Sequence, residues 1–210
     1  GLGLSETRLN PFLRDKPRDA VIVSTKIGRL LRRVEADRRD GIGKWIDVPS
    51  RSEVFDYSYD GVLRSLEFSL ERLGLDRVDV VYAHDLDVFT HGSTIARDER
   101  LGEFIAGGYL ALRRLRDEGV IRAFGAGVNE AEACDWLMER GDFDLFLLAG
   151  RYTLLEQGAA ESLLPVCQER GIGVIIGGPY NSGLLVGQGL YNYDRAPPDK
   201  AAKARRLGEV

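Results

Sequence analysis

A lysine and a histidine at the ends of two apolar runs are the residues best placed to do chemistry. Lys26 closes the run 21–25, and His84 closes the run 78–83. Partial burial lowers the pKa of a lysine, whose ammonium can polarise a neighbouring hydroxyl. A histidine can donate a hydrogen bond to a carbonyl or relay a proton near neutral pH. The alternatives are a lysine whose head reaches solvent and a histidine satisfied inside the core.

A second group of polar residues, later in the chain, could hold a ligand. Asn129 either presents its amide to a ligand or caps the next helix, with Glu132 completing a capping box. In the segment 177–183, paired glycines let the backbone approach a flat or charged ligand, and an ordinary turn is the alternative reading. The candidates in this segment are Gly177, Gly178, Tyr180, Asn181 and Ser182. Asp85, directly after His84, is a candidate for substrate contact.

We expect no metal site. The chain has 2 histidines, His84 and His91, and neither has cysteine or carboxylate ligands at zinc-site spacing. His91 lies among Gly92, Ser93 and Thr94, which indicates a surface loop.

Short apolar runs alternate with amphipathic segments along the whole chain. The runs are β-branched and almost continuously apolar, which is typical of strands buried on both faces of a parallel sheet. They cover residues 21–25, 78–83, 121–128, 145–150 and 173–178. Between them, apolar residues at three- and four-residue steps predict a helix over 59–73 that ends at Gly74. Further helices are expected around Tyr109–Leu115, after Asn129, and from about Pro165 to Gly171.

The placement of the polar residues indicates a (β/α)8 barrel, because such barrels build their sites at the C-terminal ends of several strands. The segment Gly1–Glu6 lacks a preceding strand, so it matches a dinucleotide fingerprint poorly. We expect residues 1–210 to form one barrel domain. The five apolar runs fall short of the eight strands and about 250 residues of a complete barrel, so flanking strands would be missing. The segment 28–56 is expected to be a loop over the barrel mouth, with Trp45 available for substrate contact.

Composition narrows the class of protein. The net charge of −4 argues against nucleic acid as a partner, and an arginine-rich stretch at 29–39 is interrupted by acidic residues, as in a solvated loop. The 2 cysteines, Cys134 and Cys167, fit free buried thiols in a reducing cytoplasm. No run approaches the roughly 20 apolar residues of a membrane span, and the start shows no signal-peptide pattern. We therefore expect a soluble cytoplasmic protein without membrane contact.

Four segments in order resemble the aldo-keto reductase family. Ser24–Gly28 is similar to its third-strand motif, and residues 69–79 resemble its "S-L-x-R-L-x-x-D-x-x-D" signature, which Phe55–Ser58 precedes. His84 falls where the fourth-strand histidine belongs. Residues 119–125 match "G-x-I-R-x-x-G". Residues 147–155 and 177–183 look like the branch that oxidises free aldoses, such as L-fucose and D-threo sugars, or pyridoxal.

The resemblance implies a barrel-type oxidoreductase with NAD or NADP as cofactor and a sugar or aldehyde as substrate. Lys26 would lower the pKa of a catalytic tyrosine, His84 would orient the substrate oxygen, and Asn129 would hold the nicotinamide carboxamide. Relatives often have a stacking tyrosine where this chain has Gly177, and a glutamine where it has Ala149. Both differences fit the aldose branch.

The family's catalytic tyrosine and an aspartate precede a "G-x-G-x-S-E" segment, and this chain opens at that segment. The resemblance therefore implies that the barrel domain lacks its N-terminal strands, and that it also lacks its C-terminal strand. We therefore expect the 210 residues by themselves to show negligible turnover. One alternative is a non-catalytic barrel remnant that binds a nucleotide or a protein and self-associates through exposed strand edges. Another is an unrelated barrel enzyme, such as an isomerase that uses Lys26. The sequence leaves three questions open: whether the cofactor is NAD or NADP, which sugar or aldehyde is the substrate, and whether the protein forms a homo-oligomer.

Overall fold

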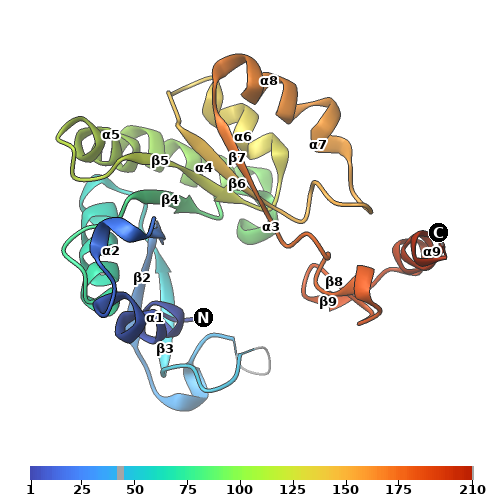
Figure 1. Cartoon of the computed structure of the whole chain (residues 1–210), viewed down its shortest axis with the longest axis horizontal. Helices are drawn as coiled ribbons and strands as arrows, with labels where there is room; N and C mark the ends of the chain where they lie inside the picture. The colour runs from blue at the N-terminus through green and yellow to red at the C-terminus, as the bar shows by residue number, and fades with distance from the viewer. Residues whose placement is uncertain (42–44, 210) are drawn as a thin grey trace. The chain divides into compact units, whose positions relative to one another are not determined.

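The computed structural model describes residues 1–41 and 45–209 of the chain. They group into two compact units (Figure 1). The first comprises Gly1–His84 and Asp98–Phe124, and the second comprises Asp85–Arg97 and Gly125–Val210. The expectation of a single barrel domain over 1–210 stays a prediction. Among the described residues, no helix has both the length and the apolar character needed to cross a bilayer.

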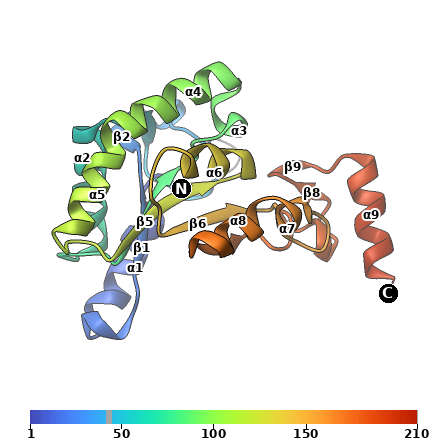
Figure 2. The same cartoon turned by 90° about the horizontal axis from the view of Figure 1, so that it is seen from above.

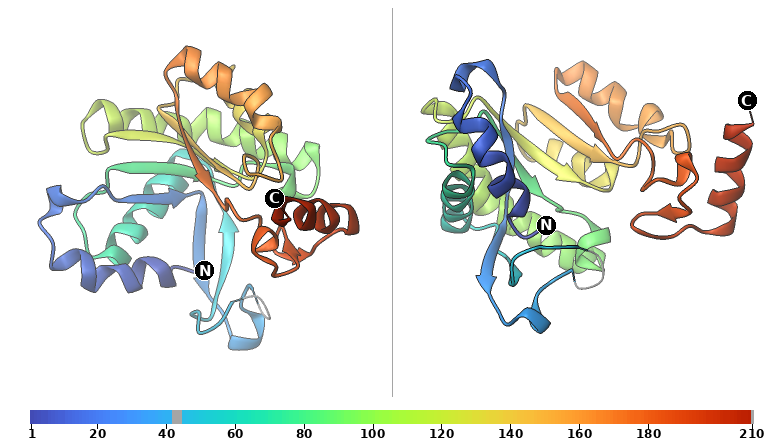
Figure 3. Two further views of the ribbon diagram at one scale, coloured as in Figure 1. Left: turned by 45° about the vertical axis from the view of Figure 1, so that its right-hand side comes forward. Right: turned by 60° about the horizontal axis from the view of Figure 1, so that its bottom comes forward.

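The first unit pairs two parallel strands and surrounds them with helices. β1 (Ser24–Ile27) and β4 (Val80–His84) run parallel, with Lys26 opposite Tyr82. The helices are α1 (Leu4–Arg14), α2 (Tyr59–Leu73), the last part of α4 (Thr94–Glu103), and α5 (Tyr109–Asp117), which a π-helical turn at Phe104–Gly108 precedes. α1 lies against α2, as Figure 3 shows. Because β1 extends to Ile27, Lys26 lies inside this strand, whereas the sequence pattern placed it directly after the apolar run 21–25.

The predicted helix over 59–73 is confirmed. The Ser58 side chain accepts a hydrogen bond from the backbone N–H of Gly61 at the start, and Gly74 ends the helix with a φ of 66°. Val62, Leu66 and Leu73 on its apolar stripe are buried. The three- and four-residue spacing of these side chains therefore reflects one face packed into the core.

The prediction of a loop over 28–56 is wrong, because this segment contains an antiparallel pair of strands. β2 (Arg29–Arg33) pairs with β3 (Arg51–Phe55), so that Arg29 faces Phe55 and Arg33 faces Arg51. Arg29 also forms a 2.6 Å ion pair with Glu53, and both side chains are largely buried. The arginine-rich sequence hides the strand, since Arg29 is neutralised by Glu53, 24 positions away, while Arg32 and Arg33 stay exposed as in a solvated segment.

The second unit contains three parallel strands. β5 (Ala123–Val128), which begins in the first unit, pairs with β6 (Leu145–Ala149), and β6 pairs with β7 (Gly173–Gly177). α6 (Ala131–Met138) and α8 (Leu163–Arg170) contact each other (Figure 2), and α8 also contacts β7 (Figure 1). The smaller elements are α3 (Val88–His91), the start of α4, α7 (Gly158–Glu161), the β8 (Leu190–Tyr191) and β9 (Asp194–Arg195) pair, and α9 (Pro198–Gly208).

These strands confirm the predicted parallel βα pattern, and α8 ends at Gly171 as expected. Cys134 and Cys167 are free and buried, which also agrees with the prediction.

Gly125 is the tightest position between β5 and β6. A Cβ atom there would lie 1.5 Å from the carbonyl oxygen of Leu145, which is its partner in the register. We expect Gly125→Ala to lower the free energy of unfolding by about 1–3 kcal/mol, because the two backbones must separate. Urea unfolding measures the change. Gly173→Ala is the matched control on the other side of Leu145, where a Cβ atom meets nothing closer than 3.4 Å. Equal losses in both variants would contradict the steric explanation.

Candidate active site

Lys26 and His84 project from one face of the β1–β4 pair. Lys26 lies opposite Tyr82 in the parallel register, and His84 follows Tyr82 by two residues, so all three side chains share a face. His84 is the last residue of β4 and is half-buried. Tyr82 is buried, and burial raises its pKa, so its phenol stays protonated at neutral pH. The structure thus brings the two predicted catalytic residues together in the first unit.

Tyr57 fixes the main chain at His84. Its hydroxyl donates a 2.6 Å hydrogen bond to the carbonyl oxygen of His84, and its ring is fully buried. The ring lies against Gly28, where a Cβ atom would be 2.2 Å from it and where φ is 98°. Only glycine tolerates both conditions. Tyr57 belongs to the 55–58 segment that the sequence singled out, yet nothing local showed that its hydroxyl would reach β4.

Burial and two neighbouring cations keep the imidazole of His84 neutral. Its pKa lies well below the ordinary value because burial penalises the charged ring, and because the positive charges of Arg29 and Lys26 act on it. A neutral imidazole has one N–H donor and one acceptor nitrogen. It can therefore donate to a substrate oxygen without carrying charge.

This lowered pKa makes the stability of the protein depend on pH. The unfolded chain takes up a proton at His84 near pH ~6.5, whereas the folded protein takes it up only at lower pH. Stability is therefore fully present above that pH and falls as pH drops through it, at up to about 1.4 kcal/mol per pH unit. We expect His84→Gln to remove this part of the fall in denaturant titrations between neutral and mildly acidic pH. His91→Gln, which keeps His84, should retain it, and identical profiles for wild type and His84→Gln would contradict the assignment.

Trp45 lies beside the start of the chain. A Cβ atom on Gly1 would be 2.8 Å from its ring, and Trp45 lines a hollow together with Leu4 and Val48. The carbonyl of Trp45 accepts a hydrogen bond from Arg39 at 3.3 Å. Its role in substrate contact stays a prediction.

Asn129 lies between two aspartates in the second unit. Its side-chain nitrogen Nδ2 donates to Oδ1 of Asp85 at 3.1 Å and to Oδ2 of Asp87 at 3.0 Å. Its backbone N–H also donates to Oδ2 of Asp87, at 2.6 Å. The structure thus brings a predicted cofactor residue and a predicted substrate residue, Asp85, into contact.

The predicted capping box at Asn129 and Glu132 is wrong. α6 begins at Ala131, its N-cap is Glu130, and no side chain caps it. Instead, Glu130 accepts hydrogen bonds from the backbone N–H groups of Val88 and Phe89, at the start of α3. Asp87 lies 42 residues before Asn129, and this long-range carboxylate accepts the backbone N–H of Asn129 that the capping box assigned to Glu132.

The segment after β7 is partly committed to internal contacts. The buried Asn181 donates from Nδ2 to the carbonyl of Gly150 at 3.1 Å, and its Oδ1 accepts from Thr153 at 2.7 Å. The carbonyl of Gly177 accepts from the N–H of Gly150 at 2.8 Å.

Two other groups of this segment face outward, whereas Ser182 makes a further internal contact. Tyr180 is 61% exposed, and Gly178 has a φ of 58°. The Ser182 hydroxyl accepts from the N–H of Tyr193 at 3.0 Å. Asn181 therefore shapes the segment, while Tyr180 and Gly178 offer a surface that a ligand can reach.

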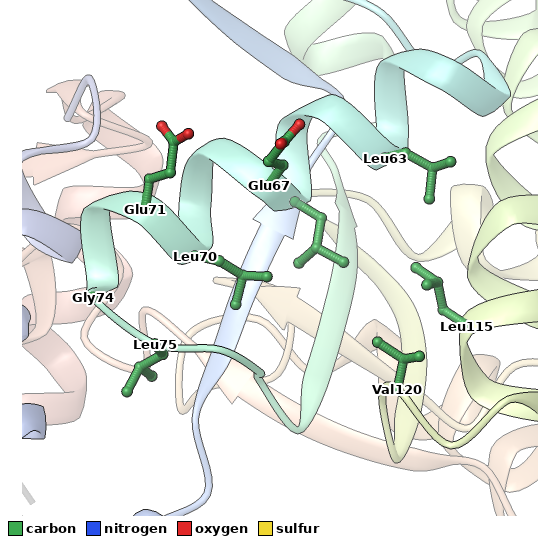
Figure 4. Close-up of a pocket in the computed structure, with 9 residues that line it drawn as sticks. Leu63, Glu67, Leu70, Glu71, Gly74, Leu75, Leu115 and Val120 are labelled. Atoms are coloured by element: carbon green, nitrogen blue, oxygen red, sulfur yellow. The ribbon is translucent and has the colours of Figure 1, made fainter.

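A groove on the outside of α2 carries none of these residues. It is lined by apolar side chains of α2 together with Leu115 and Val120, and Glu67 and Glu71 lie at its edge (Figure 4). The two carboxylates point away from Leu70 and Val120. The groove therefore lacks convergent polar groups, and we place no site in it.

A nicotinamide cofactor fits the donor and acceptor set of the second unit. The hydrogen bonds of Asn129 engage its nitrogen, which leaves its oxygen Oδ1 to accept from a carboxamide N–H₂. Gly178 and the exposed Tyr180 supply backbone approach and an aromatic surface. Among the described residues no group of three or more histidine, cysteine or carboxylate side chains could hold a metal ion.

Comparison with known proteins agrees with this chemistry. The model of the "Aldo/keto reductase family" matches residues 1–208. The whole chain is 39% identical to a pyridoxal 4-dehydrogenase of Microbacterium luteolum, covering 64% of that protein. It is 41% identical to a D-threo-aldose 1-dehydrogenase of a Pseudomonas species, covering 63% of that protein. The chain therefore spans less than two thirds of the length of these relatives.

A solved aldo-keto reductase from Bacillus halodurans, in its holo form, has the same fold. It superimposes with a TM-score of 0.70 at 24% identity, over 99% of this chain and 59% of that one. The fold is thus the α/β barrel type predicted from the strand ends. With a family match over nearly all of its length, the chain belongs to the aldo/keto reductase family.

Proposed function

We propose that the protein is an NAD(P)-dependent oxidoreductase that transfers a hydride between the nicotinamide and an aldose or a similar aldehyde or alcohol. The observation that carries the proposal is the pair of Lys26 and a neutral His84 on one face of β1 and β4. The names of two relatives, a pyridoxal 4-dehydrogenase and a D-threo-aldose 1-dehydrogenase, support polar carbonyl compounds as the substrate class.

The roles of the chain's own residues follow from their chemistry. The ammonium of Lys26 would favour the ionised form of the catalytic tyrosine hydroxyl that the family pattern places beside it. A proton then passes more easily between that hydroxyl and the reacting oxygen of the substrate. His84 donates an N–H to the same oxygen and stays uncharged because of its lowered pKa. When bound, the nicotinamide supplies or accepts the hydride. Asn129, Gly178 and Tyr180 are the residues we assign to holding it, and Asp85 and Trp45 remain candidates for substrate contact.

The test is turnover of a panel of free aldoses and pyridoxal, with NAD or NADP, by a purified protein that also carries the tyrosine and the aspartate of the family pattern, because the 210 residues by themselves are expected to show negligible turnover. We expect reduction of the cofactor with at least one D-threo aldose or with pyridoxal, and loss of that reduction in the His84→Gln variant. Binding of either cofactor without turnover of any member of the panel would contradict the proposal. That outcome would favour a nucleotide-binding role instead.

A further inference from the structure

We propose that Asp87, together with Asp85, is a positioning residue that turns the Asn129 amide so that its oxygen faces the nicotinamide. This inference rests on the proposed function. It concerns which atom of Asn129 meets the cofactor, and therefore which group on the pyridine ring the protein selects.

The orientation of the amide follows from the chemistry of its partners. An ionised carboxylate only accepts hydrogen bonds, whereas a side-chain amide has two N–H donors on nitrogen and an acceptor oxygen. Both carboxylates lie within 3.1 Å of Nδ2. Turning the amide by half a rotation would set its oxygen against two acceptors, so this rotation is strongly disfavoured.

Asp87 is itself held rigidly. It is fully buried, and its Oδ1 accepts from the backbone N–H of Thr90 at 2.9 Å, which fixes it to the first turn of α3. Its Oδ2 binds both the N–H and the Nδ2 of Asn129. A single carboxylate therefore fixes the main chain and the side chain of Asn129 at once.

With both N–H groups used, the amide has only its oxygen to offer a ligand. An oxygen accepts a hydrogen bond from the N–H₂ of a carboxamide, but finds no donor on an acetyl group in the same place. The protein should therefore bind NAD(P) more tightly than the 3-acetylpyridine analogue, whose methyl group replaces the N–H₂. One hydrogen bond corresponds to a ratio of about five- to tenfold in dissociation constant.

The experiment measures the dissociation constants of the preferred dinucleotide and of its 3-acetylpyridine analogue by calorimetry, without substrate. In Asp87→Asn the new amide can donate to the oxygen of Asn129, which lets the Asn129 amide turn. We expect the preference for the natural cofactor to fall to within about twofold. An unchanged preference in Asp87→Asn would overturn the inference.

Glu130→Gln is the matched control for a merely structural effect. Glu130 accepts the N–H groups of Val88 and Phe89 at the same start of α3, and among the described residues no hydrogen bond joins its side chain to the Asn129 amide. This variant should keep the wild-type preference. If it loses the preference as well, loosening of α3 explains both results and the positioning role is wrong.

Two further variants keep the test decisive. Should Asp87→Asn fail to fold, Asp85→Gly removes the other acceptor while tolerating the φ of 54° at that position, and it should narrow the preference in part. An unchanged preference there would equally overturn the inference.

Asn129→Ala separates the two proposals. If it keeps the full preference, Asn129 does not hold the carboxamide and that part of the proposed function fails. If Asn129→Ala loses the preference for the natural cofactor but the aspartate variants keep it, the positioning role fails while the proposed function stands.

Discussion

Replacing Lys26 by methionine is expected to lower kcat for aldose oxidation by about 10²–10⁴-fold. Methionine keeps the unbranched stem inside β1 but removes the cation that favours proton transfer at the reacting hydroxyl. Because the chemistry and not the packing is lost, the dissociation constant of the cofactor and the unfolding midpoint should stay close to those of the wild type. Steady-state kinetics, cofactor titration and denaturant unfolding of the same preparation check the three expectations together.

Lys16→Met is the control for removal of a lysine elsewhere. Lys16 lies over the ring of Phe12, 5.2 Å from its centre, and belongs to no part of the site. Its turnover should equal that of the wild type. A Lys26→Met variant with unchanged kcat would remove Lys26 from the reaction and, with it, the main support for the proposed mechanism.

Asp79→Asn is expected to cost about 3–5 kcal/mol of unfolding free energy, because it removes one member of a buried ion pair. Asp79 is 3% exposed in its side chain and binds Arg18, 16% exposed, at 2.7 Å. The same oxygen accepts the N–H of Val23, just before β1, and the other oxygen pairs with Arg122 at 3.2 Å. The neutral amide would leave the buried guanidinium of Arg18 without its counter-charge and lose an acceptor. Guanidinium chloride unfolding measures the change.

Asp19→Asn is the matched control, since it breaks an aspartate–arginine pair with Arg77 whose side chains are 80% and 41% exposed. Its cost should be below about 1 kcal/mol. Losses of similar size in both variants would show that burial of Asp79 does not decide its contribution.

The same carboxylate contributes to acid sensitivity. Burial raises the pKa of Asp79, but the hydrogen bonds from Val23 and Arg18 and the nearby arginine charges outweigh it, so the pKa lies below its ordinary value. The stabilisation is therefore complete above about pH 4 and is lost as pH falls through the lowered pKa.

Elements with a strong local pattern could be read from the sequence. The helix at 59–73 was predicted with both of its ends, because its apolar stripe and Gly74 are local signals. The parallel strands were recognised from apolar runs, with their starts displaced by up to three residues, as at β1. β2 and β3 were missed. Their residues are charged and do not alternate, and pairing across a long connection supplies the partners that local sequence cannot show.

For the site, residue types alone singled out Lys26 and His84 as candidates, since ionisable groups at the ends of apolar strands stand out in any sequence. Three features depended on the tertiary structure: the cations that keep His84 neutral, the reach of Tyr57 to its carbonyl, and the carboxylates that turn Asn129. Periodicity and capping signals act over a few residues, whereas these contacts join residues 27 to 58 positions apart. The sequence by itself determined which groups can do chemistry and on which strands they lie. Only the folded chain decided their charge and orientation, because burial and hydrogen-bond partners are set by residues distant in sequence.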